Sequence, residues 1–536
     1  MPNRLKDALE RGEFVVTVEL IPGHGAAEPS QVGEFEEGLR IWETGRVHAI
    51  SVTDNPGGNP ALLADAFAQD LADKGITPLV HITCKDRNRN QLQSQLYAME
   101  RHGIHNVLAM TGDYPVQGWH GRPRPVFDLD PVQLLQMVGD MNTGLAFQTP
   151  RTEAKEQPAH FFPGAVVSPF KYTEAETLTQ YLKLRKKVAA GARFVISQLG
   201  YDARKMEELV WYMRDHALDV PVIANIYLVT AGAARLMKRG GIPGCVMSDA
   251  LLAVLEEEAK AADKGKAARY LRAAKMVAIA RGLGYAGVHI GGLGLTAETL
   301  TTILDTANEI QGQWQDWARE LCYGQEDGWY YYRAAPPVSF PSGLNAPELT
   351  PRDEVRRDRA IQKTYGLSRF AHYWLLTQGK RGYHILKGLM SWRERKKGLH
   401  RHYGIEHTGK VLLYGCMDCG DCGLEAAIYS CPMSSCPKCQ RNGPCGGSAN
   451  GWCEVYPGER YCIYFKAYHR LKKHDELYKL DSFITPPNNW DFFETSGWSN
   501  YTHARDNAAH RQPLPPESSH TATTPNVQAP KRKEHQ

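Results

Sequence analysis

The sequence predicts an α/β protein in which a (β/α)8 TIM barrel is followed by a small cysteine-rich, metal-binding domain. Two observations predict the barrel. Eight short apolar, β-branched segments recur in the first three hundred residues, and most are followed by a segment with helical periodicity. A third observation predicts the second domain, because nine of the twelve cysteines lie between Cys416 and Cys462.

The apolar segments are the expected strands of the barrel. The stretches between them, such as 59–75 and 90–103, carry apolar residues three and four positions apart and end at glycine, which is typical of helices. An open doubly wound sheet is the structural alternative, but no Gly-x-Gly-x-x-Gly follows the first segment. The expected strands cover residues 14–20, 47–53, 76–84, 106–112, 162–168, 192–199, 220–228 and 286–292.

Composition divides the chain into four expected parts. Residues 1–310 form the barrel, and residues 311–362, rich in aromatic, proline and turn residues, form a linker or a strap lying on it. Residues 363–500 combine a basic segment with the cysteine-rich domain. Residues 501–536 have the polar, proline-rich composition of a disordered tail.

The basic segment, residues 363–410, has two interpretations. It is either a solvated helical face or a docking face for an acidic electron-transfer protein. The net charge of +4 is too small for this length to indicate nucleic acid. The N-terminus lacks an apolar signal segment, and no apolar run reaches the ~20 residues needed to span a bilayer, so we expect a cytoplasmic protein without membrane partners. A homo-oligomer of unspecified order is also expected.

Polar residues stand where the expected strands end, which is where barrel enzymes place their active sites. Glu19 is notable because a carboxylate in an apolar strand needs either a partner or a raised pKa suited to general acid catalysis. The alternative is that Glu19 only caps the adjacent loop. The complete set is Glu19, Thr53, Asp54, His81, Thr83, Asp113, Gln198, Asn225, Tyr227 and His289.

Five motifs in this region resemble those of the methylenetetrahydrofolate reductase family. They are "TVELIPG", "ISVTDN", "PLVHITC", "AMTGDYP" and "LRKKVAAGARFVISQLGYD", and the resemblance covers roughly residues 10 to 300. It implies a barrel that holds a flavin, usually FAD, at its mouth. It also implies reduction of 5,10-methylenetetrahydrofolate to 5-methyltetrahydrofolate by hydride from the reduced flavin.

The resemblance assigns roles to individual residues. Glu19 matches the catalytic acid that delivers a proton towards N10 of the folate. Asp113 matches the aspartate between flavin and pterin, and Gln198 matches the glutamine that hydrogen-bonds the pterin. The positions that match contacts to the flavin or its phosphates are Thr53, His81, Gly112, Asp113, Phe162 and Lys187.

Some positions depart from the family pattern. Thr111 stands where the family often has Arg, Gln180 replaces an acidic flavin contact, and "ELIPG" replaces a Phe-rich loop. These changes affect the dinucleotide end of the flavin site, so FMN is an alternative to FAD. The electron donor stays open between a reduced nicotinamide and ferredoxin, and the direction of the reaction stays open as well.

The cysteine spacing indicates a metal site. Cys416-x2-Cys419-x2-Cys422, completed by a more distant Cys-Pro, is the usual arrangement for a [4Fe–4S] cluster. Cys431 and Cys436 are both followed by proline and are both candidates for the fourth ligand. Nine thiolates suffice for two clusters with one left over. A zinc site is the alternative, and a redox-sensing dithiol is a third interpretation.

The block at residues 430–462 resembles the cysteine-rich C-terminal domain found with some bacterial methylenetetrahydrofolate reductases, and the resemblance spans roughly residues 370 to 480. That resemblance implies a metal centre, generally iron-sulfur, that delivers electrons to the flavin. Two other functions stay open: a folate-dependent one-carbon methyltransferase, and a non-catalytic electron-transfer subunit. The expected metal ligands are Cys416, Cys419, Cys422, Cys431, Cys436, Cys439, Cys445, Cys453 and Cys462.

Overall fold

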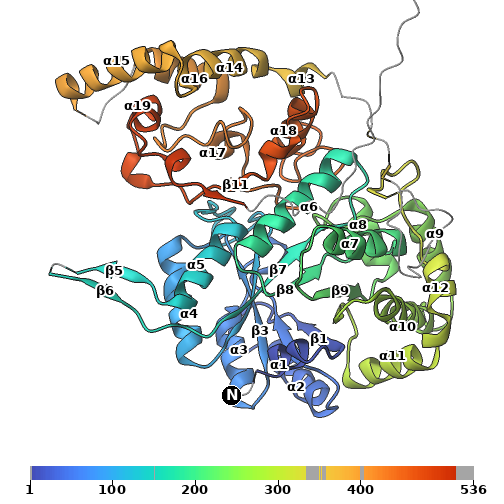
Figure 1. The fold of residues 1–536 in the computed structure, drawn as a ribbon. Coiled ribbons are helices and arrows are strands. Elements are labelled where there is room, and N and C mark those ends of the chain that lie inside the picture. The colour runs from blue at the N-terminus through green and yellow to red at the C-terminus, as the bar shows by residue number, and fades with distance from the viewer. Residues whose placement is uncertain are drawn as a thin grey trace, which may run out of the picture.

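The computed structural model describes residues 3–149, 151–332, 349–350, 352, 358–398 and 404–514. Eight parallel strands close into a barrel in the order β1-β10-β9-β8-β7-β4-β3-β2 (Figure 1). Each strand lies within one of the predicted segments, so the predicted fold class is confirmed. The strands are β1 (Val15–Leu20), β2 (Ala49–Val52), β3 (Pro78–Thr83), β4 (Asn106–Met110), β7 (Phe162–Val167), β8 (Phe194–Ser197), β9 (Val222–Tyr227) and β10 (Gly287–Gly291).

Helices surround the barrel and connect consecutive strands. Because each helix runs back antiparallel to its strand, the N-termini of the helices lie at the mouth, where the strands end. Asp130 caps α5 by accepting from the backbone N–H groups of Val132 and Gln133. The helices of the barrel region are α2 (Pro29–Glu43), α3 (Ala64–Asp73), α4 (Arg89–Arg101), α5 (Pro131–Thr143), α6 (Glu174–Ala189), α7 (Ala203–Asp215), α8 (Ala231–Lys238), α9 (Asp249–Glu258), α10 (Lys266–Leu283) and α11 (Ala297–Glu309).

Two elements of the barrel domain were not predicted. Helix α1 (Arg4–Glu10) closes the end where the strands begin, because its Leu5 and Leu9 pack there against Leu79 and Phe194. A two-stranded hairpin, β5 (Ala146–Gln148) and β6 (Glu153–Lys155), projects from the side of the barrel (Figure 1). Its three-residue strands are too short for an apolar periodicity.

The segment after the barrel begins as the expected strap. Helix α12 (Trp314–Glu320) packs against α10, where the Lys275 ammonium lies 4.2 Å from the Trp317 ring. Further on, the hydroxyl of Tyr330 donates to Asp202 at 2.7 Å, and that of Tyr332 donates to Asp215 at 2.7 Å. Both contacts tie the strap to α7. Residues 333–348, 351 and 353–357 of the expected strap lie outside the described residues.

The C-terminal region forms a second body above the barrel in Figure 1. An outer layer of helices lies furthest from the barrel, and the loop-rich cysteine segment lies between that layer and the barrel. The outer layer holds α13 (Arg359–Gln362), α14 (Tyr365–Ala371), the π-helix η3 (His372–Leu376), α15 (Arg381–Lys397) and α16 (Ile405–Tyr414). The inner part holds α17 (Pro432–Ser435), α18 (Ile463–Lys472), α19 (Gly497–Thr502) and the small sheet of β11 (Phe483–Ile484) and β12 (Gln512–Pro513).

The two bodies join through buried polar contacts at the N-termini of α5 and α6. Asp130 accepts from the backbone N–H groups of Arg441 and Asn442 at 3.2 and 2.9 Å. Glu174, in the first turn of α6, pairs with Lys472 at 2.5 Å. The cysteine-rich domain is therefore seated at the mouth end of the barrel.

The first part of the predicted tail is folded. Residues 501–514 are part of the fold, because they include the end of α19 and the strand β12 that pairs with β11. The polar composition of this stretch was misleading, since its Asn507 is buried and hydrogen-bonded rather than solvated. The rest of the predicted tail, residues 515–536, lies outside the described residues. Among the described helices, none combines the length and apolar character needed to cross a membrane.

Candidate active site

Glu19 and two histidines meet at the mouth of the barrel. Strands β1 and β10 are neighbours, and their register brings Glu19 Oε2 to 3.7 Å from His289 Nε2. The hydroxyl of Thr17 lies 2.9 Å from Nδ1 of the same ring, which fixes the ring with Nε2 facing Glu19. His81 completes the group. One ring nitrogen of His81, one ring nitrogen of His289 and one carboxylate oxygen of Glu19 all lie within 4.8 Å of one another.

The charge of Glu19 is controlled by these neighbours. Burial alone raises the pKa of a carboxyl, but the contact with His289 and the charges of His289 and His81 outweigh it and leave the pKa of Glu19 lowered. Burial lowers the pKa of His81 to about 4, so this ring is neutral near pH 7. Of the two outcomes expected for Glu19, the structure shows the partner, and that partner is His289. The sequence placed His289 at a strand end but gave it no role.

The loop after β4 brings Asp113 to the same mouth. Asp113 Oδ2 accepts from the backbone N–H of Gly57 at 2.8 Å, which anchors it to the loop after β2. Gly112 adopts φ +83°, and a Cβ at this position would lie 2.8 Å from Thr83 Cβ. Only glycine fits this turn without displacing β3.

Gln198 lies where the barrel meets the cysteine-rich domain. Its Oε1 accepts from the N–H of Leu199 at 2.9 Å. A Cβ built on Gly244 would lie 3.4 Å from Gln198 Nε2 and 3.2 Å from the carbonyl of Gly446. The structure thus brings Gln198 to the mouth with Glu19 and Asp113, and places a loop of the second domain beside it.

Phe162 lies away from the mouth, and Lys187 is occupied by a contact within the barrel. Phe162 is the first residue of β7, and it packs with Leu5 and Phe194 at the opposite end of the barrel, so its assignment to the flavin site is corrected. Lys187 is buried under α6 with Nζ donating to the carbonyl of Val166, and burial lowers its pKa to about 7. Because Nζ of Lys187 already donates to the Val166 carbonyl, this geometry does not support the predicted contact of Lys187 with a flavin phosphate.

Lys183, which the sequence did not single out, is a lysine of α6 that meets the second domain. Its Nζ donates to Gln440 Oε1 at 2.8 Å and to the carbonyls of Gly443 and Pro444 at 3.1 and 3.0 Å. Spacing within the helix could not reveal this role, because every partner lies more than 250 residues away.

The nine clustered cysteines separate into two groups of four, with Cys439 left over. We call Cys436, Cys445, Cys453 and Cys462 the inner group, because all four line one cavity. We call Cys416, Cys419, Cys422 and Cys431 the outer group. The first three of these line a second cavity, and Cys431 acts electrostatically on Cys419 and Cys422 and also on Cys439, the cysteine outside both groups. All twelve cysteines are free thiols.

Burial makes these thiols poor acids on their own. It raises the pKa of Cys416 and of Cys445 to about 11, and that of Cys462 to about 12. A metal binds the thiolate, so metal binding must displace these protons. The grouping also separates the two Cys-Pro candidates, because Cys431 belongs with the triplet and Cys436 belongs with the inner group.

The inner group lies against the barrel. Lys438 and Glu454 line its cavity and form a buried ion pair, and Lys438 Nζ donates to the carbonyl of Gly112 at 2.8 Å. On the cavity side, Cys445 Sγ lies 3.5 Å from Glu454 Oε1. A continuous set of polar contacts therefore leads from the inner group to the Gly112–Asp113 loop.

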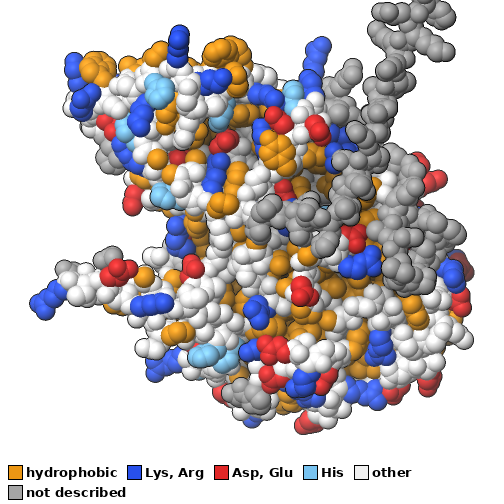
Figure 2. All heavy atoms as spheres, viewed as in Figure 1, with side chains coloured by type: hydrophobic (Ala, Val, Ile, Leu, Met, Phe, Trp, Pro, Cys, Tyr) orange, Lys and Arg blue, Asp and Glu red, His pale blue; other side chains and the backbone are white. Residues whose placement is uncertain are grey.

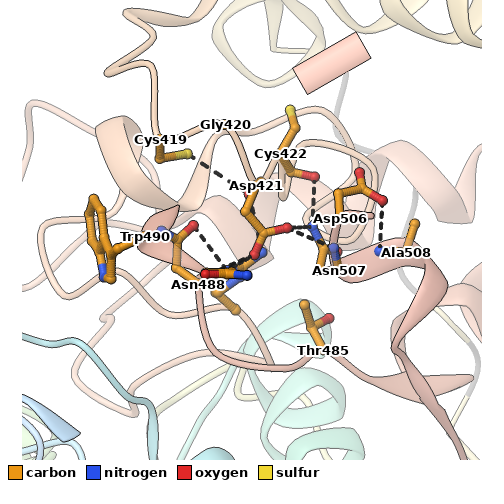
Figure 3. Close-up of polar contacts among 12 residues, drawn as sticks. Cys419, Gly420, Asp421, Cys422, Thr485, Asn488, Trp490, Asp506, Asn507 and Ala508 are labelled. Atoms are coloured by element: carbon orange, nitrogen blue, oxygen red, sulfur yellow. Dashed lines mark hydrogen bonds and ion pairs between the residues drawn. The ribbon is translucent and has the colours of Figure 1, made fainter. Parts of the chain in front are cut away.

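A buried carboxylate organises the outer group. Asp421 accepts from the backbone and side-chain nitrogens of Asn507 at 2.7 and 2.8 Å and from the N–H of Asn489 at 3.1 Å (Figure 3). Arg441 completes its shell with an ion pair at 3.2 Å. Burial opposes ionisation, but these partners leave the pKa of Asp421 lowered. The loop between Cys419 and Cys422 is thereby fixed to segments that come much later in the chain.

Comparison with known proteins gives a family. A family model described as "Methylenetetrahydrofolate reductase" matches residues 4–308, more than half of the chain. The chain belongs to the methylenetetrahydrofolate reductase family. A second model, "Methylene-tetrahydrofolate reductase C terminal", matches residues 399–491 and so covers both cysteine groups.

Curated members of the methylenetetrahydrofolate reductase family match only in part. "Probable methylenetetrahydrofolate reductase (NADPH)" of Caenorhabditis elegans is 25% identical over 35% of this chain and 26% of its own length. "Methylenetetrahydrofolate reductase (NADH) 1" of Arabidopsis thaliana is 24% identical over 42% and 37%. "5,10-methylenetetrahydrofolate reductase" of Pectobacterium carotovorum subsp. carotovorum is 29% identical over 29% and 45%. The chain thus spans less than half the length of each.

The residues at the mouth fit the flavin that methylenetetrahydrofolate reductases generally use. The hydroxyls of Thr53 and Ser168 are buried and have no hydrogen-bond partner among the described residues. They follow β2 and β7 at the mouth end, where a polar ring system would supply the missing partners. The turn at Gly112 provides a backbone surface at the same mouth.

Proposed function

We propose that this protein reduces 5,10-methylenetetrahydrofolate to 5-methyltetrahydrofolate with a flavin held at the barrel mouth. The observation that carries the proposal is the contact of Glu19 with His289 at the same mouth as Asp113 and Gln198, in a barrel of this family. The residues that fit the flavin, Thr53, Ser168 and the Gly112 turn, do not distinguish FAD from FMN. When bound, the flavin supplies the hydride.

The residues of the chain supply the proton and the positioning. Glu19, whose Oε2 lies 3.7 Å from His289 Nε2, would deliver a proton towards N10 of the folate. Asp113, anchored by Gly57, places a negative charge beside the electron-poor folate, and Gln198 offers an amide to the pterin. Thr53 and the Gly112 turn would hold the flavin ring.

We also propose that both cysteine groups hold iron-sulfur clusters that pass electrons to the flavin. Each group offers four thiols, which is the ligand set of one [4Fe–4S] cluster. The spacing Cys416-x2-Cys419-x2-Cys422 favours such a cluster over the separated Cys-x2-Cys pairs of a zinc site. The contact of Lys438 with Gly112 makes the inner group the one nearest the flavin position.

The decisive experiment is an anaerobic spectrum of the purified protein with flavin, iron, sulfide and zinc quantified on one sample. We expect bound flavin and comparable amounts of iron and sulfide, and we expect added 5-methyltetrahydrofolate to bleach the flavin. A preparation without flavin would overturn the reductase assignment. Zinc without iron or sulfide would overturn the electron relay alone.

Substitutions in the two cysteine groups should remove separate clusters. We expect Cys436→Ser and Cys422→Ser each to lower the iron content from roughly eight to roughly four atoms per chain, since each loses a ligand of one cluster. Cys322→Ser is the matched control, because this thiol lies outside both groups and donates to the carbonyl of Ala318. If either single substitution removed all iron, the division into two groups would be wrong.

Lys438 should control transfer between the inner group and the flavin. Lys438→Met together with Glu454→Gln removes the ion pair without leaving one charge buried alone. We expect slower flavin reduction in stopped-flow experiments that start from reduced clusters, while flavin and iron contents stay unchanged. Lys438→Arg, which keeps the charge and a donor, should recover part of the rate. Equal rates in all three proteins would exclude a positioning role for Lys438.

A further inference from the structure

Helix α15 carries two apolar stripes, and only one of them packs against the protein. Tyr383, Leu386 and Met390 are buried. Ile385, Leu389 and Trp392, which are four and three positions apart on another face, are 71%, 47% and 49% exposed. An amphipathic surface helix needs one apolar stripe, so the second stripe calls for a partner.

The exposed stripe belongs to a larger surface that we call the outer helix face. Thirteen of the 28 large hydrophobic residues exposed in the described chain lie between residues 367 and 417, about a tenth of the sequence. Single exposed apolar residues are ordinary, but a concentration of this kind marks an interaction site. The face comprises Leu367, Phe370, Tyr373, Trp374, Leu375, Ile385, Leu389, Trp392, Ile405, Val411, Leu412, Leu413 and Met417.

Cations surround this apolar surface. Along the upper edge of Figure 2, orange hydrophobic side chains alternate with blue Lys and Arg side chains. The acidic residues of the same helices point inward instead, since Glu394 pairs with Arg505 at 2.8 Å and Glu406 with Lys410 at 2.5 Å. The exposed cations of the face are Lys363, Arg381, Lys387, Arg395 and Lys396.

This charge pattern defines the partner. A surface with an apolar centre and a cationic rim fits a partner that presents apolar contacts within an acidic rim. A second copy of this chain fits poorly, because a twofold axis through the face would set cations against cations. Of the two interpretations of the basic segment, the exposed apolar residues of the outer helix face favour a docking face over a solvated helical face.

The face adjoins the outer cysteine group. Helix α16 ends at Tyr414 with Gly415 as its C-cap, the next residue is Cys416, and Met417 is 50% exposed. His407 and Lys410 of the same helix line the cavity of the outer group. A partner docked on the face would therefore stand beside the first cluster of the relay.

We propose that the outer helix face is the docking site for a small acidic iron-sulfur protein that supplies electrons to the outer cysteine group. The inference rests on the proposed function. Each docking event oxidises the partner by one electron and reduces the outer group by one. Two such events, with two protons from solvent, balance the conversion of one methylene group to one methyl group.

The test uses the holoprotein and a reduced bacterial 2[4Fe–4S] ferredoxin as the probe. In the variant, Ile385, Leu389 and Trp392 are each replaced by Ser. The control carries Val32→Ser and Leu271→Ser, two comparably exposed apolar residues on barrel helices. We expect the variant to lose about tenfold or more of its second-order rate with ferredoxin, because a few apolar anchors carry most of an interface's binding energy. Reduction by dithionite should be unchanged, and the control should match the wild type.

The other outcomes are distinguishable. Equal rates for variant and wild type, or no reaction of the wild type with ferredoxin while dithionite still reduces it, would overturn the docking site and leave the reductase intact. Cosedimentation with phosphatidylglycerol vesicles that the variant loses would identify a membrane surface instead, and a dimer that the variant dissociates would identify a second copy. If dithionite reduces neither flavin nor iron, the proposed function fails. The docking site is then tested separately by calorimetric titration of the wild type and the variant with oxidised ferredoxin, in which equal binding by both proteins would overturn it.

Discussion

Replacing Glu19 by Gln should slow reduction of the bound flavin by 5-methyltetrahydrofolate by ~10²- to 10⁴-fold, the range that general acid-base groups contribute. The amide keeps the shape of the side chain but cannot act as the acid that delivers a proton to the folate. Flavin content should be unchanged, because the hydroxyls and the glycine turn that fit the flavin belong to other strands. Anaerobic stopped-flow absorbance at the flavin band measures the rate.

Two further variants make the Glu19 result specific. Glu43→Gln removes an exposed carboxyl of α2 and should leave the rate within the error of the wild type. His289→Asn should slow the reaction and raise the apparent pKa in its pH profile, because the neighbour that lowers the pKa of Glu19 is gone. A Glu19→Gln protein that retained a third or more of the wild-type rate would contradict the acid role.

Replacing Asp421 by Ala should destabilise the region around the outer cysteine group by ~3–5 kcal/mol, the usual cost of removing one partner of a buried ion pair. The change leaves the Arg441 guanidinium buried beside Asn488 and leaves the N–H groups of Asn489 and Asn507 without their acceptor. In native-state hydrogen exchange, the amides of Asn489 and Asn507 should exchange ~10²- to 10⁴-fold faster, since each tenfold change corresponds to ~1.4 kcal/mol.

The control for Asp421 lies nearby. Asp491 is exposed on the same side of the domain, and its replacement by Ala should change exchange rates little, as is usual for surface positions. Asp421→Asn should fall between the two, because it keeps one acceptor oxygen but loses the charge facing Arg441. Unchanged exchange in Asp421→Ala would mean that the outer group does not depend on this carboxylate.

The sequence predicted the barrel well because its signals are local. Each strand is a short apolar run followed by helical periodicity, and the residues at strand ends meet at one mouth by topology alone. This is why Glu19, Asp113 and Gln198 could be brought together in advance. Phe162 was misplaced because it begins a strand whose far end faces the mouth.

The features that were missed depend on contacts between distant parts of the chain. In the sequence, Lys183 is an ordinary helix lysine, and only the fold shows its contacts with residues 440–444. In the same way, only the fold shows that Lys438 donates to the carbonyl of Gly112. His289 pairs with Glu19 across a register that links the first strand to the last. The second stripe of α15 was obscured by its many cations. No local pattern encodes such pairings.

The seating of the cysteine-rich domain on α5 and α6 also sets an order of assembly. The hydrogen bond between Asp130 and Arg441 can form only after Arg441 has been synthesised, 311 residues after Asp130. At ~5–20 residues per second, that interval lasts on the order of 15–60 s. The last barrel helix, α11, ends at Glu309. For the final 132 residues of that interval, on the order of 7–26 s at the same rate, the barrel is complete in the chain while its mouth still exposes carboxylates and ammonium groups that will later be buried. Under the proposed function, the flavin would enter an open barrel before the second domain covers the mouth.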